Sequence, residues 1–304
     1  MRKKISIIIP VYNQVERLHL TLHSFRYQTC SMDAFEVVVV DDGSNDDTSS
    51  VVNSLSLPYH LEYIYQTNHG RAAARNHGVK KATGNILIFN DADRAVSPNF
   101  VSAHLGRHEC HPDIVAVGAI YEFYFGDLSL RHTELLEDIS HGYTKFGRLA
   151  REFAYAKAVQ NMFDSSGRTQ YHIPWISLFS GNMSLKRETF TQVGGFDEGF
   201  VDWGFEHFEF GLRLYKAGIK YIFEPLARNY HFAHQREQNF YRNKIQNSFE
   251  YFKKKYPGEP IELLVEFLSG RLSLLEYEAR ISGIPVEKDG GAGVILPKLV
   301  RISL

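Results

Sequence analysis

Two aspartates stand directly after an apolar run of the sequence. Asp91 and Asp93 are separated only by Ala92 and follow the apolar residues 86–89. In extended backbone, residues two apart point to the same side, so both carboxylates could bind one hard divalent cation that also bridges phosphate oxygens. Such a triplet is frequent by chance, and this one gains weight from its position. We expect the strand to end at Asp91 and a helix, opened by Ser97-Pro98, to begin right after Asp93.

Two further polar loops also follow predicted strands. Pro10-Val11-Tyr12-Asn13 comes after the apolar run 5–9, and Asp41-Asp42-Gly43-Ser44 comes after the run 35–40. In open parallel sheets, ligands bind outside the carboxyl ends of the strands, where loop backbone and helix N-termini converge. These loops are therefore candidates for ligand binding, although an Asx-type turn that caps the next helix explains Asp42 equally well.

Two predicted helices begin with charged side chains. Arg71 and Arg75 follow Gly70, and they are either solvated helix charges or guanidinium groups offered to a nucleotide or to the aspartate pair. Glu206 and Glu209 share one face of a second helix, whose positive end favours acidic side chains whatever their function. An exposed Trp203 before that helix is easier to explain by stacking on a sugar or a base than by burial in the core.

The histidines divide into two groups. His231 and His234 follow a predicted strand, and one of them could supply a third metal ligand, although a hydrogen-bonded loop histidine is an equally good explanation. His104, His108 and His111 are spaced as on one helix face, but their pattern is one residue short of the zinc-protease motif, so we expect them at the surface.

The elements that must position these residues alternate along the first third of the chain. Short, nearly continuous apolar runs are separated by helical periodicity, as in the segment that contains Val15, Leu18, Leu22 and Phe25, which is typical of a mostly parallel sheet covered by helices on both faces. The apolar runs are 5–9, 35–40, 61–65, 86–89 and 114–117, and later 175–179, 183–185 and 221–223. Further helices are expected at 134–137, 148–159, about 205–217, beyond 234 and at 263–276, and the last 15 residues are expected to form a loosely docked tail.

Composition excludes several classes of protein. The 304 residues carry 34 basic and 35 acidic side chains, a net charge of −1, so no strong field would attract nucleic acid, while contact with a membrane surface stays open. No window approaches the roughly 20 apolar residues of a spanning helix, and no secretory signal opens the chain, which predicts a cytoplasmic protein. The only cysteines, Cys30 and Cys110, are too few for a disulfide framework or a thiolate zinc site, and we expect both to be reduced packing residues.

Taken together, the motifs resemble glycosyltransferase family 2, whose members use nucleotide sugars and have the GT-A fold. The matching segments are Pro10-Val11-Tyr12-Asn13, Val40-Asp41-Asp42-Gly43-Ser44, Gly70 through Gly78, Asp91-Ala92-Asp93 and Gly194-Gly195-Phe196-Asp197. The segment 203–213 with Gly218 is also similar to the C-terminal signature shared by galactosyl- and N-acetylgalactosaminyl-transferases and bacterial chondroitin-type polymerases. The match covers roughly residues 5–237.

The resemblance implies a nucleotide site at the first loops. Asp42 would hold the uracil ring of a UDP-sugar, with Pro10 and Tyr12 lining its pocket. Arg71 and Arg75 would border the nucleotide.

The resemblance also implies a metal and sugar site. Asp91 would approach the ribose or the metal, and Asp93 would bind Mn²⁺ or Mg²⁺ directly, with His234 as the third ligand. Trp203 would stack near the transferred sugar and the acceptor, and Gly181-Asn182 would line the sugar site.

One residue departs from the family pattern. The family usually has Glu-Asp at the start of the later helix, where the Asp is the general base of inverting enzymes, and here the pair is Glu206-His207. A neutral imidazole accepts a proton as readily as a carboxylate, so His207 is the first candidate base. Glu206 is the rival candidate and Glu209 a more distant one.

These expectations define a function and a domain organisation. The leading hypothesis is a metal-dependent hexosyltransferase that moves a hexose or N-acetylhexosamine from a UDP-sugar to a saccharide, peptide or small molecule, with inversion. The alternative is a nucleotide-sugar-binding subunit that has lost its base and scaffolds a partner enzyme. A pyrophosphorylase or a dinucleotide oxidoreductase would need a Gly-rich loop after the first strand, which is absent.

The GT-A domain is predicted at 1–237, with a nucleotide-binding half at 1–120, an insertion forming the acceptor wall at 121–171 and a catalytic half at 172–237. A helical extension and tail follow at 238–304.

Overall fold

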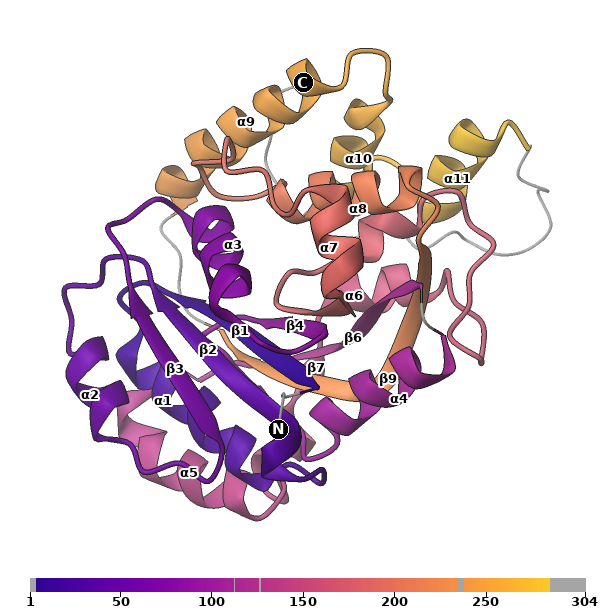
Figure 1. Ribbon diagram of the computed structural model, residues 1–304. Coiled ribbons are helices and arrows are strands. Elements are labelled where there is room, and N and C mark those ends of the chain that lie inside the picture. Colours follow the sequence, from indigo (N-terminus) through magenta and orange to yellow (C-terminus); the bar gives the residue numbers. More distant parts are fainter. Residues whose placement is uncertain (1–3, 112, 126, 234–237, 285–304) are drawn as a thin grey trace.

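The computed structural model describes residues 4–111, 113–125, 127–233 and 238–284, and its centre is a strongly curved sheet (Figure 1). The strands are β1 Ile5–Val11, β2 Phe35–Asp41, β3 His60–Tyr65, β4 Ile86–Asn90, β5 Arg94–Val96, β6 Ile114–Phe123, β7 Arg151–Glu152, β8 Asn182–Lys186 and β9 Lys220–Phe232. They lie in the order β3-β2-β1-β4-β8-β6-β9-β5, with β7 paired to β6. Strands β1 to β4 are mutually parallel, and β8 runs antiparallel to its neighbours β4 and β6.

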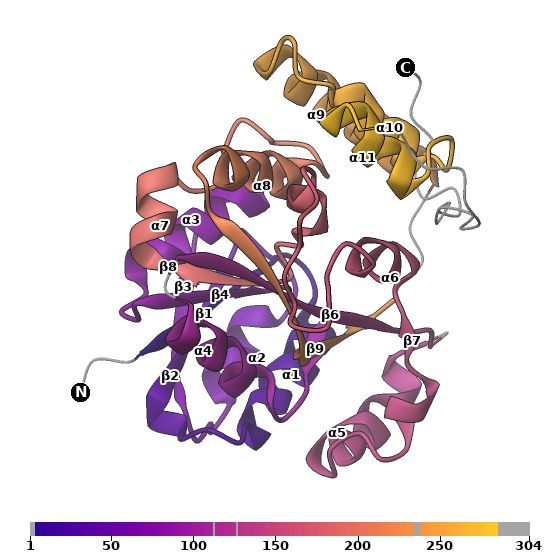
Figure 2. The ribbon, with the colours of Figure 1, turned by 90° about the vertical axis from the view of Figure 1, so that its right-hand side faces the viewer.

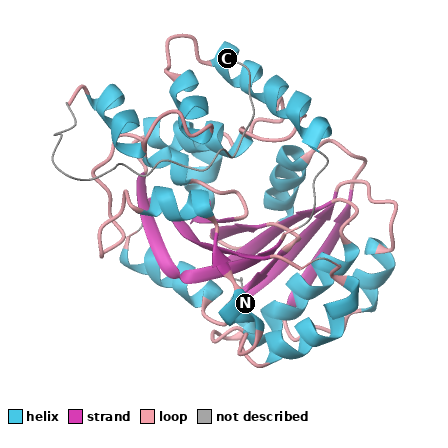
Figure 3. Ribbon diagram, turned by 180° about the vertical axis from the view of Figure 1, so that it is seen from behind, coloured by secondary structure: helices cyan, strands magenta, loops and turns pink. Residues whose placement is uncertain are grey.

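Helices cover both faces of the sheet (Figures 1 and 2). One face carries α1 Val15–Ser24, α2 Thr48–Ser54, α4 Phe100–Cys110 and α5 His132–Ser140, and the other carries α3 Arg71–Lys81, α6 Ala154–Gln160, α7 Arg187–Val193 and α8 Glu206–Lys216. The extension consists of α9 Gln238–Lys255, α10 Ile261–Leu268 and α11 Leu274–Ser282. Seen from behind, the strands form one continuous layer between these groups of helices (Figure 3).

The apolar strands are buried on both sides, which is why they read as continuous runs rather than as alternating ones. In β2, Val38 and Val40 pack into the cluster beneath α3 and α8, whereas Val37 and Val39 pack into the cluster beneath α1 and α4. The predicted α/β fold with helices on both faces is therefore confirmed.

Three local predictions were wrong. The residues after Asp93 form β5, which pairs with the distant strand β9, and α4 begins only at Phe100. The run 175–179 forms a 3₁₀ turn, Pro174–Ser177, because Pro174 fits the start of a helical turn but has no N–H for a sheet. The single helix expected at 263–276 is two helices, since Ser273 and Glu276 form a capping box that starts α11.

The predicted insertion at 121–171 divides between the two faces of the sheet. Leu135 and Ile139 of α5 share an apolar cluster with Leu20 of α1, whereas Tyr155 of α6 contacts the ring of Phe208 in α8. Only the α6 part of the insertion thus lies on the same face as α8 (Figure 2).

Two absences concern the described part of the chain. There, no helix is both long and apolar enough to cross a membrane. Cys30 and Cys110 are free thiols, and Cys110 is exposed rather than packed, contrary to expectation. The expected loose tail falls on residues outside the described ranges.

Candidate active site

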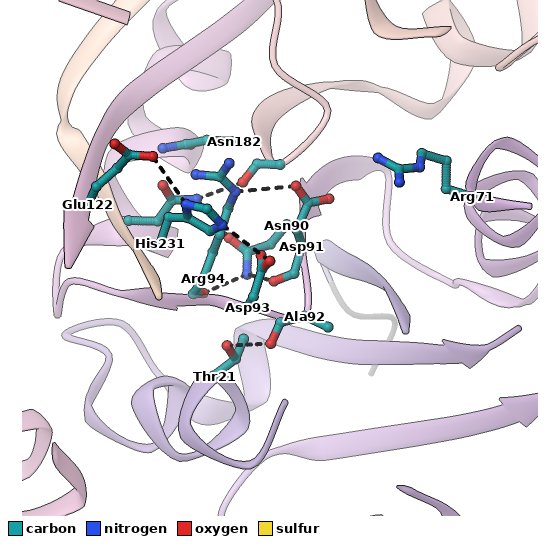
Figure 4. A network of polar contacts seen from close by, with 12 residues as sticks. Thr21, Arg71, Asn90, Asp91, Ala92, Asp93, Arg94, Glu122, Asn182 and His231 are labelled. Carbon is teal, nitrogen blue, oxygen red and sulfur yellow. Dashed lines mark hydrogen bonds and ion pairs between the residues drawn. The ribbon is translucent and has the colours of Figure 1, made fainter. Parts of the chain in front are cut away.

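The aspartate pair lies in a tight turn, not in extended backbone as expected. Strand β4 ends at Asn90, one residue before the predicted end, and the Arg94 amide then donates to the Asp91 carbonyl at 3.2 Å. The side-chain amide of Asn90 donates to the backbone carbonyls of Asp91 and Arg94 at 3.0 and 2.9 Å. The Thr21 hydroxyl donates to the backbone carbonyl of Ala92 at 2.8 Å (Figure 4). The turn is therefore held rigidly from the sheet and from α1.

Two arginines bind the first aspartate of the turn. Arg75 Nη2 lies 2.8 Å and Arg94 Nε 3.2 Å from the Asp91 carboxylate. Burial raises the pKa of Asp91, but these guanidinium groups outweigh burial and lower the pKa overall. Asp91 is thus an anion in a cationic setting.

Arg75 also reaches the acidic helix α8. Its Nη1 lies 3.3 Å from Glu206 Oε1, and the arginine side chain is buried. Small residues make this contact possible: a Cβ on Gly78 of α3 would lie 2.6 Å from Ile8, so the helix packs very close to the sheet. One buried guanidinium therefore joins the aspartate turn to the start of α8, segments 115 positions apart in the sequence (206 − 91).

Helix α8 begins abruptly. Gly204 has φ +98° and Phe205 φ +68°, a left-handed conformation that is uncommon for a residue with a side chain and is often found at functional sites. The abrupt start makes Glu206 the first residue of the helix, where the helix dipole favours its charge. Burial raises the pKa of Glu206, whereas His207, Arg71 and Arg75 lower it, and the net pKa is below the ordinary value.

The two candidate bases on α8 differ in accessibility. Glu206 has a side-chain exposure of 2%, and His207, whose Nδ1 lies 3.8 Å from Glu206 Oε2, has 20%. The His207 ring lies between Phe179 and Phe208, with ring planes 18° and 44° apart. Of the two, His207 is the side chain that a substrate can reach.

Glu209 has a structural role in the protein. Its carboxylate accepts hydrogen bonds from Arg213 Nε at 2.8 Å, Lys255 Nζ at 2.7 Å and the Tyr256 hydroxyl at 2.6 Å. The group is fully buried and fastens α9 to α8. Full burial and these three donors argue against Glu209, the more distant candidate base.

The second aspartate of the turn faces a histidine. Asp93 Oδ2 lies 3.3 Å from His231 Nε2, and His231 Nδ1 lies 3.3 Å from Glu122 Oε1 (Figure 4). Burial lowers the pKa of His231, but the two carboxylates raise it overall. The other candidate histidine, His234, lies outside the described residues.

The residues expected at the nucleotide base lie on two linked loops. The backbone N–H of Asn13 donates to Ser44 Oγ, and the backbone N–H of Asn45 donates to Asn13 Oδ1, both at 2.9 Å. The loops after β1 and β2 therefore form one unit. Tyr12 is half exposed there, and Pro10 is partly buried at the end of β1.

Asp42 already has partners in this unit. Its carboxylate accepts hydrogen bonds from the Gln66 side chain and from the backbone amides of His69 and Gly70, at 2.7 to 2.9 Å. The turn within this loop is held by Asp41, which accepts from the backbone amide of Ser44 at 2.8 Å. Asp42 therefore holds the loop that leads into α3, and its role toward uracil stays a prediction.

Two residues predicted at the sugar site lie in different surroundings. Gly181 lies against the aspartate turn: a Cβ there would be 2.2 Å from Asp91 Oδ2. Asn182 is fully buried, and its amide donates to the carbonyls of Ala119 and Ala227 at 3.0 Å. Its side chain is thus turned into the sheet, and its role toward a sugar stays a prediction.

Arg71 and Trp203 form a partly exposed pair beside α8. The Arg71 guanidinium lies 5.6 Å from the centre of the Trp203 ring and 3.9 Å from Glu206. Arg71 is 40% exposed, so an aromatic face and a cation are both available at the start of α8.

Two of the histidines expected at the surface are in the core. His104 and His108 are buried, and both hydrogen-bond to Ser184 Oγ at 2.8 Å. Burial lowers the pKa of His104 to about 3 and that of His108 to about 4. Their burial could not be predicted from the sequence, because their partner Ser184 lies on β8, 80 residues from His104.

A divalent cation fits the donor types at the turn, and two carboxylate oxygens beside an imidazole are ligands that Mn²⁺ and Mg²⁺ accept. Among the described side chains, however, no three of His, Cys, Asp or Glu are arranged to hold a metal ion. Asp93 is the described candidate ligand, while Asp91 is committed to its arginines.

Sequence reasoning missed the residues behind the turn. Asn229 donates to Asn90 Oδ1 at 3.0 Å and to the Gly181 carbonyl at 2.6 Å, and Arg94 holds Asp91. Asn90 stands next to the triplet and offered a signal. Glu122 and Asn229 offered none, because only strand pairing brings them to the turn.

Comparisons with known proteins agree with this fold. The model of glycosyl transferase family 2 matches residues 6–173, and the model described as the N-terminal domain of galactosyltransferase matches residues 161–235. The first match covers more than half of the chain, which therefore belongs to glycosyl transferase family 2, a family of enzymes.

Curated relatives agree with this assignment. The uncharacterized glycosyltransferase YfnE of Bacillus subtilis is 33% identical over 72% of this chain and 62% of its own length. Validoxylamine A glucosyltransferase of Streptomyces hygroscopicus is 30% identical over 84% of this chain and 61% of its own length. Chondroitin synthase of Escherichia coli is 26% identical over 75% of this chain and 34% of its own length. The chain thus spans about three fifths of the length of the first two relatives.

Solved structures share the GT-A fold. TarS of S. aureus superposes with a TM-score of 0.62 at 18% identity, over 88% of this chain and 43% of that one. GalNAc-T7, solved with UDP, GalNAc and Mn²⁺, also superposes with a TM-score of 0.62, at 20% identity, over 88% of this chain and 50% of that one. TarS has also been solved with UDP-GlcNAc.

Proposed function

We propose that this chain transfers a hexose or N-acetylhexosamine from a UDP-sugar to an acceptor, with inversion and with the help of Mn²⁺ or Mg²⁺. The observation that carries the proposal is Arg75, which binds Asp91 at 2.8 Å and Glu206 at 3.3 Å and so brings the donor turn and the acceptor helix together. Structural neighbours solved with UDP and Mn²⁺ or with UDP-GlcNAc support the choice of donor and cation.

His207 acts as the base in this proposal. With a hydrogen on Nδ1, which faces the ionised Glu206 at 3.8 Å, Nε2 keeps its lone pair and accepts the proton of the acceptor hydroxyl. The acceptor oxygen then bonds to the anomeric carbon from the side opposite the diphosphate, and the carbon–oxygen bond to UDP breaks. A bound cation supplies compensation for the charge on the leaving diphosphate.

Two regions are assigned to binding. Trp203 and Arg71 offer a stacking face and a cation to the sugar and the acceptor, next to the base. The acceptor wall is assigned to the α6 part of segment 121–171, since α6 packs against α8 whereas α5 packs beside α1. Pro10, Tyr12 and Asp42 are assigned to the uracil end of the donor.

The first test is UDP-sugar hydrolysis and transfer with and without Mn²⁺, across a panel of donors. We expect turnover to require the cation and Asp93→Ala to abolish it. An Asp93→Ala variant with full activity would remove the metal role. Tight UDP binding without any product across the acceptor panel would instead favour a binding subunit, the alternative that the His207 departure suggests.

The base is tested by a matched pair of variants. His207→Asn, which cannot accept a proton, should lower turnover by about 10²- to 10⁴-fold while UDP affinity stays unchanged. His207→Asp restores the carboxylate usual in the family and should keep most of the activity. If Glu206→Gln abolishes turnover and His207→Asn is mild, Glu206 is the base.

A further inference from the structure

Glu122 and His231 lie next to the turn that carries Asp93, on neighbouring strands. In the sheet, His231 of β9 is the partner of Glu122 in β6 and of Arg94 in β5. The imidazole stands between two carboxylates, at 3.3 Å from Glu122 on one nitrogen and 3.3 Å from Asp93 on the other (Figure 4). The side-chain exposures of these three residues are only 9 to 12%, so the contacts are shielded from water.

A bulge in β9 creates this pairing. Gly118 pairs with Glu224, but the next residue, Ala119, pairs with Arg228, so residues 225–227 leave the ladder. Glu122 stands four residues after Gly118, and without the bulge its partner would be Arg228 (224 + 4) rather than His231. A shift of three residues also reverses which side chains point to each face, because the period of a strand is two.

The bulge is fixed from behind by a buried amide. Asn182 donates to the carbonyls of Ala119 and Ala227, one on each strand of the bulge, at 3.0 Å. Gly118 leaves the space that this amide needs, since a Cβ there would lie 2.2 Å from Asn182 Oδ1. The position of His231 relative to Glu122 is therefore built into the sheet.

We propose that Glu122 is a positioning residue, which holds the His231 ring so that Nε2 faces and orients the Asp93 carboxylate for the cation. This inference rests on the proposed function, in which Asp93 binds the cation. The Tyr124 hydroxyl donates to the second oxygen of Glu122, so the carboxylate is anchored at both oxygens. Groups that hydrogen-bond a metal ligand commonly change metal affinity when they are removed, and Glu122 acts through such a group, His231.

Cation binding, measured without sugar transfer, tests the proposal. In calorimetric titrations of the folded chain with MnCl₂ in the presence of UDP, Glu122→Ala should bind Mn²⁺ about 10- to 100-fold more weakly than the native chain. Glu122→Asp keeps the charge but has one methylene fewer to reach Nδ1, and it should weaken binding less than Glu122→Ala does, with less risk to folding. The control is Glu152→Ala, an exposed glutamate of β7 that pairs with Lys157, which should leave Mn²⁺ affinity unchanged.

Turnover at rising Mn²⁺ separates positioning from loss of structure. Excess Mn²⁺ should restore turnover of Glu122→Asp, whereas a damaged fold would not recover. The proposal would be overturned if both Glu122 variants bound Mn²⁺ as tightly as the native chain. It would also be overturned if turnover of Glu122→Asp stayed low at all Mn²⁺ concentrations, or if the native chain bound neither Mn²⁺ nor Mg²⁺. A native chain that binds Mn²⁺ in a Glu122-dependent way but transfers no sugar would contradict the proposed function and leave this inference standing.

Discussion

Arg75 is the residue on which the arrangement of the site depends. It is a fully buried cation between the Asp91 carboxylate, whose side chain is 30% exposed, and the buried carboxylate of Glu206. Such a group is weak evidence for stability by itself, but removing it takes the nearest guanidinium away from the buried Glu206 carboxylate.

Replacing Arg75 by Met should therefore be strongly destabilising. We expect a loss of about 3 to 5 kcal/mol in the free energy of unfolding, measured by urea denaturation. Arg71→Met is the control, since Arg71 is 40% exposed and lies 3.9 Å from Glu206, and it should change stability by no more than about 0.5 kcal/mol. An Arg75→Met variant as stable as Arg71→Met would show that the bridge contributes nothing.

At the residue scale, sequence reasoning identified chemistry better than contacts. Asp91, Glu206 and Arg75 were all singled out, because charged residues at strand ends and helix starts are visible in the sequence. The contact of Arg75 with Asp91 was one of the alternatives, but its contact with Glu206 was not predicted, since only folding brings positions 75, 91 and 206 together. His104 shows the limit: its helical spacing suggested a surface position, yet its partners on β8 bury it.

At the scale of elements, the bulge of β9 decides which side chains meet. Asn182→Ala should destabilise the protein by about 2 kcal/mol or more, because two buried carbonyls lose their donor. The measurement is again urea denaturation. Asn53→Ala, on the exposed face of α2, is the matched control and should be nearly neutral.

The same variant should also weaken Mn²⁺ binding, since the bulge sets His231 opposite Glu122. A stable Asn182→Ala variant with native Mn²⁺ affinity would contradict the account of the bulge.

Elements set by local pattern were predictable, and those set by distant pairing were not. The boundaries of β1, β2 and β4 were predicted to within two residues. These strands are buried on both faces, and such strands consist of continuous runs rich in Val and Ile, which are visible in the sequence. Strand β5 has three residues and exists because β9 offers a partner, and the bulge of β9 depends on Asn182 from a third strand. No short window of sequence contains either fact.

At the scale of the whole molecule, the two buried histidines predict how stability depends on pH. His104 and His108 are neutral in the folded chain, with pKa values lowered to about 3 and about 4, mainly by burial. In the unfolded chain both titrate near 6.5, so between about pH 6.5 and 4 only the unfolded state binds their protons. Stability should therefore fall as pH decreases through this window.

Each of these histidines contributes a slope of up to about 1.4 kcal/mol per pH unit. The pKa of His231 is raised, so its contribution to stability is complete below about pH 6.5 and is lost as pH rises. Above about pH 6.5 it opposes the slope of the two buried histidines, and below about pH 6.5 it leaves that slope unchanged. Urea midpoints at pH 7, 6 and 5 test the prediction, with His108→Gln as the variant that removes one titrating group. The native chain should lose stability over this range, and the loss should be smaller in His108→Gln by about one proton's slope. Equal pH dependence of the two proteins would show that His108 is protonated in the folded chain and that the core tolerates its charge.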